Sequence, residues 1–556
     1  MKIVGFQSGH DVSYCILEDG VPVIHEEYER FLREKEPLGD GLEWFFKNTT
    51  DEELKDIKYF TEGNPFNRSG KYGPVCSKEE PYQRMKTHIK KVDGSHFIVS
   101  HHQSHAANAF FSSNYDEALI ITIDGGGNEK NDWEDVHSEY KDGLGTSFTC
   151  WSGKGNKIKP IKIYKDSEIN LGAFYQSITG KVFGLSIGHP YGFQGGTVMA
   201  MACMGDSNKY FDKFYEYFDK YVIMKNLPPH NKREIFDEMM GLNQFRNIVD
   251  KSEEEKFDVA AGAQKAFEVV TRYTIAPYIE KYNPKNLCLS GGSVLNSVMV
   301  GKMYDWYPSV ENIYVCPVPY DSGLAIGSAQ YVYHQVFDKP RIIWKDNASP
   351  YLGRTYDEKS IWFEVDKVFD KVRFEIVDDD YVVDLLTKDD NVISVFGGGS
   401  ESGRRALGNR SILADPRSPE MKGIINEKVK HRQWFRPFAP SITREDVKDW
   451  FEKDIDSPYM TVVIKFKEEM RDKVPAVVHI DGTARLQTVT KNDNEWYYNF
   501  IKKFQKKTGV PILLNTSFND REPIVETPEH AINCFLRTNI DYLYFREYGI
   551  LVSKVK

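Results

Sequence analysis

The stretch Ala118-Leu-Ile-Ile-Thr-Ile-Asp-Gly-Gly-Gly127 joins a short apolar run to a turn of three glycines. An apolar run of this length that stops at a turn signal is typical of a strand buried inside a sheet. The arrangement recurs at Leu287-Cys-Leu-Ser-Gly-Gly-Ser-Val-Leu-Asn296, and again from Asn312–Pro317 to Gly327. Ligands of α/β proteins bind at the ends of such strands. We therefore predict an α/β fold with a ligand site at these glycine turns.

Strand and helix signals surround these turns, and they agree with an α/β fold. Alternating or β-rich runs predict strands, and apolar residues at helical spacing predict a helix. The expected elements are strands at Lys2–Gln7, Tyr14–Leu17, Val21–Tyr28 and Phe97–Val99, a hairpin of Gly145–Trp151 with Lys159–Tyr164, and a long helix over Asp258–Tyr282. The sequence shows no internal repeat.

The length of the chain predicts more than one domain. Its 556 residues exceed what one hydrophobic core usually organises. A looser segment that contains proline and asparagine begins near Pro340. We place a first domain at residues 1–345, a connector at residues 346–363 and a second α/β domain at residues 364–556.

Charge and cysteine content limit the classes of partner and compartment. The formal net charge of −10 argues against general attraction to nucleic acid or anionic membranes. No apolar run approaches membrane-spanning length, and the first residues contain no signal-peptide core. The seven cysteines are scattered and never spaced as C-x-x-C, so neither a disulfide framework nor a zinc knuckle is indicated. We expect a cytoplasmic protein.

Two histidines lie four residues apart in His101-His-Gln-Ser-His105, at the start of a predicted helix, and so share one helical face. Imidazole pairs at this spacing can bind Fe, Zn, Ni or Cu, although a histidine at a helix start can also act only as a cap. Asp124 and Asp321 each follow a buried strand, where a carboxylate could complete the coordination. These four residues are our candidate divalent-metal site.

The last third of the chain carries a stretch rich in glycine and arginine, Gly397–Arg417, followed by Lys430-His-Arg-Gln-Trp-Phe-Arg436. Glycines let a backbone approach a ligand closely, and guanidinium and ammonium groups match phosphate and carboxylate oxygens. A solvated basic loop is the alternative. We predict an anion pocket whose cations are Arg404, Arg405, Arg410, Arg417, Lys430, Arg432 and Arg436.

The three glycine turns and the histidine pair together resemble the duplicated nucleotide-binding core of actin-like ATPases and sugar kinases. Backbone N–H groups at such turns can bind phosphates, and glycine leaves room for a nucleotide. On this likeness, the candidate nucleotide-binding residues of the N-terminal domain are Gly125, Gly126, Gly291, Gly292 and Asn296.

Longer motifs make the resemblance specific. In chain order they are His10-Asp-Val-Ser13, His101-His-x-x-His-Ala-Ala107, Asp124-Gly-Gly-Gly127, Gly291-Gly-Ser-Val-Leu-Asn-Ser297, Arg405-Ala-Leu-Gly-Asn-Arg-Ser-Ile-Leu-Ala-Asp-Pro-Arg417, Arg436-Pro-Phe-Ala-Pro440, His479-Ile-Asp-Gly-Thr-Ala-Arg485, and Asn515-Thr-Ser-Phe-Asn519 with Glu522-Pro-Ile-Val525. Together they resemble the ATP-dependent O-carbamoyltransferases of nodulation-factor and antibiotic tailoring. The likeness covers essentially the whole chain.

This resemblance implies two joined domains and two reactions. The N-terminal domain would have the duplicated actin-like, sugar-kinase-like fold, and the C-terminal domain a YrdC-like α/β fold. The C-terminal domain would form carbamoyl-adenylate from carbamoyl phosphate and ATP, with Mg²⁺, and release phosphate and pyrophosphate. The N-terminal domain would bind that intermediate through a metal, with iron expected, and pass the carbamoyl group to an acceptor hydroxyl.

The resemblance also assigns residues to these steps. The carbamoyl phosphate and ATP site would comprise Arg405, Lys430, Arg436, Arg485 and Ser517, of which the first three are catalytic candidates. Cations there would offset the repulsion between a small dianion and a triphosphate. His479, Asn515 and Asn519 are candidate neutral partners of the carbamoyl amide, with turn or strand-end hydrogen bonding as the alternative. His10 is the candidate general base of the transfer step.

Two positions depart from the family pattern, and other readings stay open. Arg404 stands where a proline is usual, and Thr197 lies near the place of a lysine. A small-molecule kinase of the actin-like fold would use the same glycine turns but would leave the C-terminal cations unexplained. A hydrogenase-maturation carbamoyltransferase would normally add a cysteine-rich zinc region. A catalytically silent nucleotide-binding scaffold would be expected to lose the arginine and histidine positions, which are all present.

The sequence does not indicate the acceptor. A small molecule, a sugar, or a hydroxymethylated nucleobase free or in DNA would each offer a hydroxyl. Lysines that protect a solvated hairpin edge are more common than lysines that bind DNA there. The N-terminal lysines in question are Lys154, Lys157, Lys159, Lys162 and Lys165. A homodimer is an open alternative.

Overall fold

The computed structural model describes residues 1–63, 79–127, 145–165, 168–186, 194–223, 242–344 and 349–555. The chain divides into two compact units. Unit 1 contains Met1–Glu29 and Lys35–Ala348, and unit 2 contains Arg30–Glu34 and Ser349–Lys556. Short segment 30–34 therefore belongs with the C-terminal unit, although it lies near the start of the sequence.

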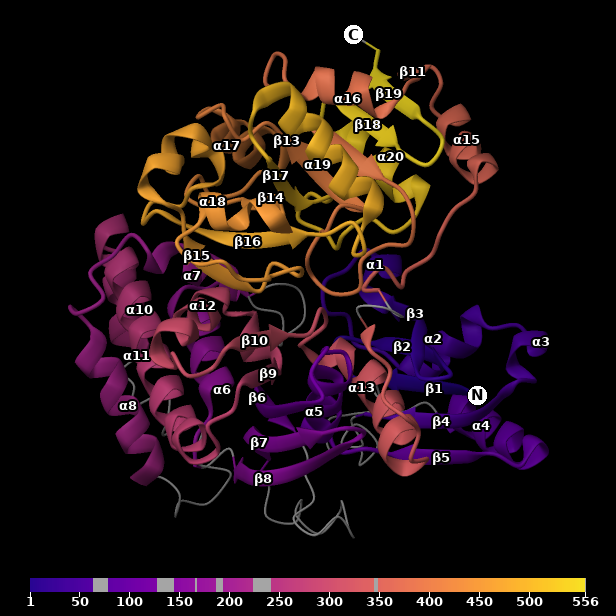
Figure 1. The fold of residues 1–556 in the computed structure, drawn as a ribbon, viewed down its shortest axis with the longest axis vertical. Coiled ribbons are helices and arrows are strands. Elements are labelled where there is room, and N and C mark those ends of the chain that lie inside the picture. Colours follow the sequence, from indigo (N-terminus) through magenta and orange to yellow (C-terminus); the bar gives the residue numbers. More distant parts are fainter. Residues whose placement is uncertain are drawn as a thin grey trace. The chain divides into compact units, whose positions relative to one another are not determined.

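Unit 1 contains two sheets (Figure 1). The first has the order β3 (Val21–Glu27), β2 (Ser13–Glu18), β1 (Lys2–Gln7), β4 (Ile57–Glu62) and β5 (Ser95–Ile98). The second has the order β10 (Asn312–Val315), β9 (Asn286–Ser290), β6 (Glu117–Gly127), β7 (Thr146–Lys154) and β8 (Lys157–Lys165). The strands expected from the sequence are confirmed as members of these sheets.

The two sheets of unit 1 have the same topology. In each sheet the first three strands form an antiparallel meander, β1-β2-β3 in one and β6-β7-β8 in the other. The next two strands then extend the sheet in parallel, β4 and β5 beside β1, and β9 and β10 beside β6. This repeat confirms the expected duplicated α/β core, which sequence similarity between the halves does not reveal.

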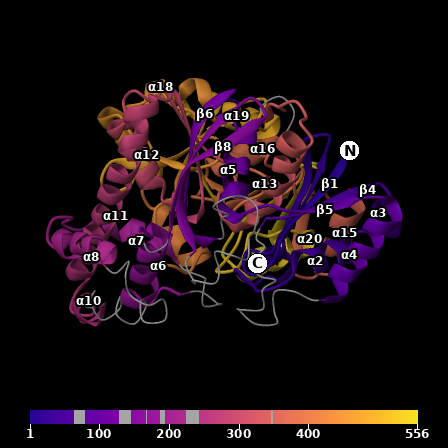
Figure 2. The same cartoon turned by 90° about the horizontal axis from the view of Figure 1, so that it is seen from below.

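Helices of unit 1 cover these sheets. Their bounds are α1 (Tyr28–Leu32, whose end lies in unit 2), α2 (Gly41–Asn48), α3 (Asp51–Leu54), α4 (Glu79–Val92), α5 (His101–Phe111), α6 (Leu171–Ser177), α7 (Gly195–Ala202), α8 (Phe211–Ile223), α10 (Leu242–Val249), α11 (Glu253–Tyr282), α12 (Ser297–Trp306) and α13 (Leu324–Tyr331). Helix α11 begins after its N-cap Ser252 and ends at Asn283, which has a left-handed conformation. Helices α8 and α10 pack against it (Figures 1 and 2).

Helix α5 is buried along its whole length and packs closely against α13. A Cβ atom added at Gly327 of α13 would lie 1.9 Å from the backbone oxygen of Ser104 in α5. Glycine is therefore required where the two helices approach. This contact fixes α5, which carries the histidine pair, against α13.

Unit 2 is built on one nine-stranded mixed sheet. Its order is β11 (Val372–Ile376), β19 (Ile550–Lys554), β18 (Tyr542–Phe545), β12 (Ile393–Phe396), β13 (Arg410–Ala414), β17 (Ile512–Ser517), β14 (Ala439–Thr443), β16 (Thr483–Val489) and β15 (Val462–Lys465). Its helices are α15 (Glu358–Asp366), α16 (Asp379–Leu386), α17 (Met421–Ile424), α18 (Val447–Trp450), α19 (Glu495–Thr508) and α20 (Pro528–Arg537). The second α/β region is thus confirmed, while its YrdC-like character stays a prediction.

Candidate functional site

Four side chains of unit 1 meet at the ends of strands, as the sequence predicts for a metal site. His101 and His105 lie one turn apart on α5, Asp124 follows the buried part of β6, and Asp321 begins the short helix after β10. One ligand atom from each residue lies within 4.8 Å of those of the other three. All four residues are buried. We call these residues the metal-ligand cluster.

Imidazoles and carboxylates pair within the metal-ligand cluster. His101 Nε2 lies 3.2 Å from an Asp124 oxygen, and His105 Nε2 lies 3.4 Å from an Asp321 oxygen. Burial works to raise the pKa of Asp124, but the hydrogen bond and charge of His101 lower it below its usual value. His105 Nε2 is buried and makes no hydrogen bond. These donors fit a divalent cation, since neutral imidazole and carboxylate are ordinary ligands of Fe, Zn and Mn.

Neighbouring residues distinguish the two candidate ligands from His102, which lies between them. Both nitrogens of His102 are engaged, by the Thr122 hydroxyl at 2.5 Å and the Thr146 carbonyl at 2.9 Å. The Ser290 hydroxyl lies 3.3 Å from His105 Nδ1, which leaves Nε2 directed into the cluster. A partner of this kind fixes the orientation of a metal-binding imidazole.

His10 lies beside the same cluster. Its Nε2 is 3.4 Å from an Asp321 oxygen and its Nδ1 is 3.0 Å from an Asp11 oxygen. Burial works to lower the pKa of His10, but the two carboxylates outweigh it and raise the pKa to about 10. In this arrangement His10 is a cation that donates hydrogen bonds. Its role as general base stays a prediction.

The structure shows different environments for the glycines of the predicted glycine turns. A Cβ atom at Gly291, whose φ is +95°, would lie 2.2 Å from the Ile123 oxygen, so close strand packing alone requires glycine there. The N–H of Gly292 donates to an Asp124 oxygen at 2.7 Å. At Gly125 and Gly126, no described atom lies within 4 Å of an added Cβ. An added side-chain carbon would meet open space at both positions, and their nucleotide binding stays a prediction.

Asn296 is committed to structural hydrogen bonds. Its side chain caps α12 by accepting from the Met299 N–H at 3.1 Å. Its Nδ2 donates to the Gln264 side chain at 2.9 Å. A contact of Asn296 with a nucleotide would therefore have to compete with these bonds, and that role stays a prediction.

In unit 2, four partly buried arginines form a group of like charges, which we call the arginine cluster. Its members are Arg405, Arg432, Arg436 and Arg485. Burial, and then the charges of the other three, lower the pKa of Arg485 well below its usual value. Burial likewise lowers the pKa of Arg432 and of Arg436. No described carboxylate contributes to these three shifts. The cluster therefore favours an anion.

Two neutral polar side chains of unit 2 each keep an unsatisfied atom. Burial lowers the pKa of His479 to about 4, and the nearby Arg485 charge adds to this against the opposing Asp481 carboxylate. His479 Nδ1 is 3.1 Å from the Thr483 hydroxyl, while its Nε2 is buried without a hydrogen bond. Asn515 donates to Gln487 at 2.8 Å, and its Oδ1 is also buried without a hydrogen bond. Such atoms are expected where a polar ligand binds.

Lys430, Ser517 and Asn519 form a second group in unit 2. The Lys430 ammonium donates to the Asn519 side-chain oxygen at 2.6 Å and to the Ser517 carbonyl. The Ser517 hydroxyl donates to Asn519 at 2.8 Å. The structure therefore brings these three predicted residues together at the end of β17.

Two arginines of the predicted anion pocket are engaged by other groups of the protein. Arg410 is fully buried and donates to the carbonyls of Gly397 and Asn409, at 2.9 and 3.0 Å, while it lies over the Phe396 ring. Arg417 makes a paired contact with Asp415, with the shortest distance at 2.6 Å. An anion would have to compete with these contacts, so anion binding by Arg410 and Arg417 stays a prediction.

Other expected features are placed as follows. Thr197 is buried in the first turn of α7, where its hydroxyl lies 3.4 Å from the Gln194 side chain, and it brings no charge. On the β7–β8 hairpin, Lys154 pairs with Glu117 at 3.0 Å and Lys157 with Asp338 at 2.7 Å. Within the described residues, no helix combines the length and apolar character that a membrane crossing needs.

Comparison with known proteins shows the family to which the chain belongs. The family model described as carbamoyltransferase N-terminus matches residues 78–330, and the one described as carbamoyltransferase C-terminus matches residues 384–552. The nodulation protein NolO of Bradyrhizobium diazoefficiens is 33% identical over 465 residues, which cover 80% of this chain and 77% of that protein. The chain belongs to the carbamoyltransferase family.

Further relatives of this carbamoyltransferase share less of their length or sequence. The nodulation protein NolNO of Sinorhizobium fredii is 34% identical over 482 residues, which cover 83% of this chain and 65% of that protein. A solved structure of HypF from T. kodakarensis superposes with a TM-score of 0.35 at 13% identity, over 61% of this chain and 48% of that protein. The family models and the two nodulation proteins confirm the carbamoyltransferase class expected from the motifs.

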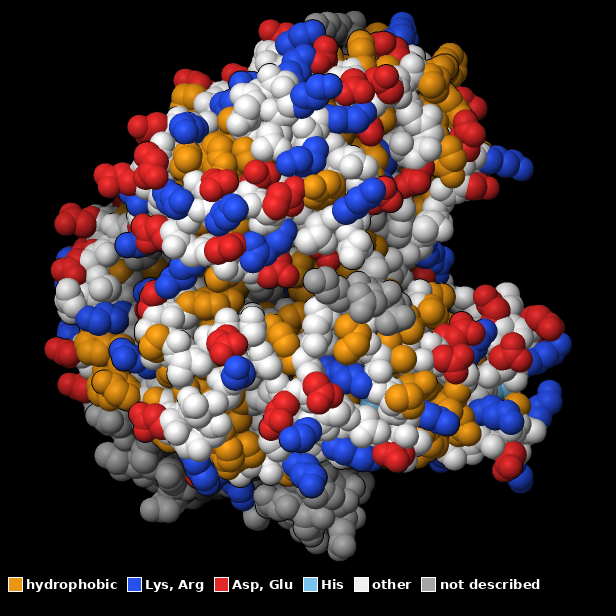
Figure 3. Space-filling view, viewed as in Figure 1, with side chains coloured by type: hydrophobic (Ala, Val, Ile, Leu, Met, Phe, Trp, Pro, Cys, Tyr) orange, Lys and Arg blue, Asp and Glu red, His pale blue; other side chains and the backbone are white. Residues whose placement is uncertain are grey.

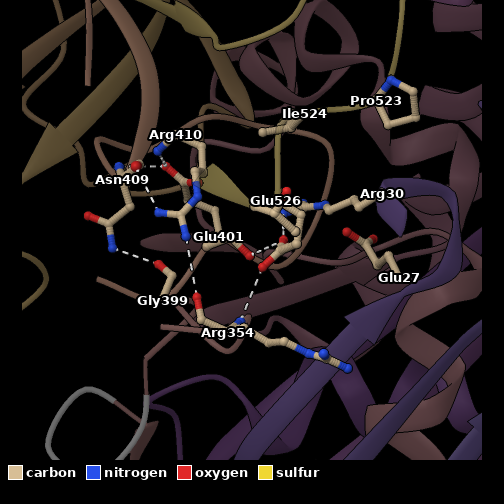
Figure 4. A network of polar contacts seen from close by, with 12 residues as sticks. Glu27, Arg30, Arg354, Gly399, Glu401, Asn409, Arg410, Pro523, Ile524 and Glu526 are labelled. Carbon is tan, nitrogen blue, oxygen red and sulfur yellow. Dashed lines mark hydrogen bonds and ion pairs between the residues drawn. The ribbon is translucent and has the colours of Figure 1, made fainter. Parts of the chain in front are cut away.

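Sequence reasoning missed the carboxylates that shape the loop before β13 of the carbamoyltransferase. A Glu401 oxygen accepts three backbone N–H groups, from Leu407 at 2.7 Å, Asn409 at 2.8 Å and Arg410 at 3.1 Å (Figure 4). This carboxylate fixes the loop that carries Arg405. The sequence does contain one signal of this role, since Glu401 is an acidic residue within the arginine-rich stretch Gly397–Arg417.

Segment 30–34 reaches the same region, and no sequence signal indicates it. Arg30 donates to the Gly403 carbonyl at 2.6 Å and lies 3.7 Å from a Glu526 oxygen (Figure 4). Arg33 donates to the Ile524 carbonyl at 2.8 Å. The two arginines therefore hold the loop before Arg405 and the loop after Asn519, although they are distant from both in sequence.

Proposed function

We propose that this carbamoyltransferase forms carbamoyl-adenylate in unit 2 and transfers its carbamoyl group to an acceptor hydroxyl in unit 1. The arginine cluster carries the proposal, because burial lowers the pKa values of Arg432, Arg436 and Arg485, the charges of neighbouring arginines lower that of Arg485 further, and a bound anion would offset this repulsion. Carbamoyl phosphate and ATP supply several phosphate groups of the required charge. ATP dependence, the adenylate and the acceptor class all belong to this proposal.

The first step breaks and forms bonds around the arginine cluster. Water cleaves carbamoyl phosphate into carbamate and phosphate, and a carbamate oxygen then attacks the α-phosphorus of ATP and displaces pyrophosphate. Arg405, Arg436 and Arg485 would bind the phosphate oxygens and stabilise charge that develops on them. Neutral His479 and Asn515 would hydrogen-bond the carbamoyl amide through their unsatisfied atoms. Lys430 would hold Ser517 and Asn519 in place.

The second step uses unit 1. His101, His105, Asp124 and Asp321 would hold a divalent ion, which supplies Lewis-acid activation of a carbonyl when it is bound. Gly125 and Gly126 would leave room for the adenylate. The acceptor oxygen attacks the carbamoyl carbon, AMP leaves, and the acceptor proton passes to a base. The donor set suits iron, zinc and manganese, so iron is part of the proposal.

A product assay tests the first step. The purified protein is incubated with ATP and carbamoyl phosphate, and ³¹P NMR follows the products. We expect pyrophosphate and phosphate in equal amounts, with AMP rather than ADP as the nucleotide product after hydrolysis of the adenylate. Formation of ADP alone would contradict the proposal and would favour a kinase.

A mass-spectrometric screen tests the second step. Candidate small molecules, sugars and hydroxymethylated nucleosides are offered with ATP and carbamoyl phosphate, and each is examined for the mass of one added carbamoyl group. The same acceptors offered without ATP serve as the control. Carbamoylation that proceeds equally well without ATP would refute the adenylate route.

A further inference from the structure

Strand β11 (Val372–Ile376) forms one edge of the nine-stranded sheet of unit 2 (Figure 1). It pairs in antiparallel fashion with β19 on one side. Within the described residues, no strand pairs with its other side. An edge strand of this kind presents backbone donors and acceptors that another strand can bind.

Large apolar side chains are exposed on and beside β11. Phe374 and Ile376 of the strand are 52% and 65% exposed, and Phe363 of α15 and Phe369 of the preceding turn are 61% and 72% exposed. Trp362 of α15 packs edge-on against Phe374, with ring centroids 4.9 Å apart. Hydrophobic side chains gather on the surface over β11 and α15 (Figure 3). Clusters of exposed apolar side chains mark interaction surfaces.

The hydrogen bonds to β19 show which residues of β11 have open backbone groups. The Val555 N–H donates to the Lys371 carbonyl at 2.9 Å, and the Val377 N–H donates to the Gly549 carbonyl at 2.8 Å. Bonded pairs alternate along an antiparallel ladder, so the odd-numbered residues of β11 direct their backbone groups to β19. Val372, Phe374 and Ile376 therefore direct theirs to the open side. The Val372 carbonyl there accepts a hydrogen bond from the Arg373 guanidinium at 3.1 Å, which a partner strand would have to replace.

We propose that β11 is a dimer interface that pairs with β11 of a second copy around a two-fold axis at Phe374. In this register Phe374 lies opposite itself and Val372 lies opposite Ile376 of the other copy. Arg373 lies opposite Glu375 of the other copy, and symmetry repeats this pair. The strand sequence Val-Arg-Phe-Glu-Ile is thus self-complementary in both charge and apolar character.

The backbone supports the same register. Phe374, Val372 and Ile376 would form hydrogen-bonded pairs through the groups that face the open side. The two Arg373–Glu375 pairs would then occupy non-hydrogen-bonded positions, where facing side chains are closest. Charge complementarity, backbone pattern and apolar exposure therefore all fit one arrangement.

A second copy fits β11 better than an unrelated partner does. Two identical strands can satisfy each other only if the sequence complements itself when reversed, as this strand does. A two-fold contact also closes on itself and stops at a dimer. Charged residues on edge strands often serve only to prevent pairing, but such a role does not require opposite charges at matching positions.

Charge reversal tests the proposal. Sedimentation velocity on the full chain over a range of concentrations should show a dimer. Arg373→Glu or Glu375→Arg would each place like charges opposite one another twice per dimer, and should weaken dimerisation roughly tenfold or more. The double variant Arg373→Glu/Glu375→Arg should restore it, because it exchanges the two charges.

A second variant tests the backbone part of the proposal. Phe374→Pro removes the central N–H, which faces the open side and not β19, so the monomer should fold while the dimer is lost. Thermal unfolding by circular dichroism confirms that each variant is folded. A monomer at every concentration, open-ended association, or a dimer that none of these variants changes would overturn the proposal.

Discussion

The metal-ligand cluster and the arginine cluster balance their charges in opposite ways. In unit 1, imidazoles meet carboxylates, as at the 3.2 Å contact between His101 and Asp124. In unit 2, guanidinium groups meet one another, and the pKa of Arg485 falls through burial and their charges. Buried like charges destabilise a fold unless a ligand compensates them. The metal-ligand cluster can therefore persist alone, whereas the arginine cluster gains most from its anion.

Removing a ligand from the metal-ligand cluster should have the largest effect on the overall reaction. His105→Ala deletes one of four donors, so we expect the bound metal and carbamoyl transfer to be lost. Formation of carbamoyl-adenylate should continue, because that step depends on unit 2. Metal content by mass spectrometry and pyrophosphate release measure the two outcomes separately.

The neighbouring histidine provides the matched control. His102→Asn removes an imidazole whose nitrogens are both engaged by threonine residues, so the metal content should stay at the wild-type level. If His105→Ala instead stops pyrophosphate release and keeps the metal, the division of the two steps between the units is wrong.

Removing one charge from the arginine cluster should slow adenylate formation strongly, although the effect should be smaller than the complete loss of transfer expected for His105→Ala. Arg485→Met should lower the rate of pyrophosphate release about 10²- to 10³-fold, because one stabilising cation is lost. The free energy of unfolding without ligands should rise by about 1 kcal/mol, since repulsion among partly buried cations is relieved. Pyrophosphate assays and urea unfolding measure the two effects.

Arg417 supplies the control for this variant. Because Asp415 already pairs with Arg417, Arg417→Met should leave pyrophosphate release near the wild-type rate. A parallel loss of activity and stability in Arg485→Met would mean that Arg485 supports the fold and does not bind an anion.

The contrast between the clusters also explains what the sequence could predict. The four candidate metal ligands follow from short-range rules, a helical spacing of four and carboxylates after buried strands, and the structure brings all four together. For the arginines, the sequence could predict a cationic group but not which of its members face a ligand. Whether Arg410 meets a ligand or the carbonyl of Gly397 depends on packing that spacing does not encode.

The fold shows the same limit. Apolar runs ending at glycine turns predict β6, β9 and β10, because a buried strand leaves a strong local pattern. The duplicated topology of its two sheets arises from strand order, which the sequence does not display as a repeat. The contacts of Arg30 and Arg33 join segments hundreds of residues apart, so only the folded chain reveals them.

Protonation of His479, which lies near Arg485, should make the free energy of unfolding depend on pH. Its pKa is lowered from 6.5 to about 4 in the fold, so between these values the unfolded chain binds more protons and stability falls as pH falls. From pH 7 to 5 this contributes a loss of about 2 kcal/mol, which His479→Asn should remove from the urea-unfolding profile. Bound phosphate should reduce the loss, because an anion favours the protonated imidazole.

Two other histidines allow the origin of this effect to be checked. The pKa values of His530 and His334 are also lowered to about 4, chiefly by burial, so His479→Asn should keep their share of the acid sensitivity. If phosphate leaves the wild-type profile unchanged while it still binds, His479 does not face the anion.

A substitution of Glu401 should have the smallest effect of these variants. It distinguishes a role in ordering the loop that carries Arg405 from a direct role in binding the anion. Glu401→Gln keeps an acceptor oxygen for the N–H groups of Leu407 and Asn409 but removes its charge, so the free energy of unfolding should fall by about 1 kcal/mol. The loop that carries Arg405 would then be held less firmly. We therefore expect a severalfold higher KM for carbamoyl phosphate with little change in kcat, whereas Glu420→Gln, on an exposed turn, should change neither. A fall in kcat alone would instead show that Glu401 acts on the reacting groups, and the arginine cluster would then contain a carboxylate partner after all.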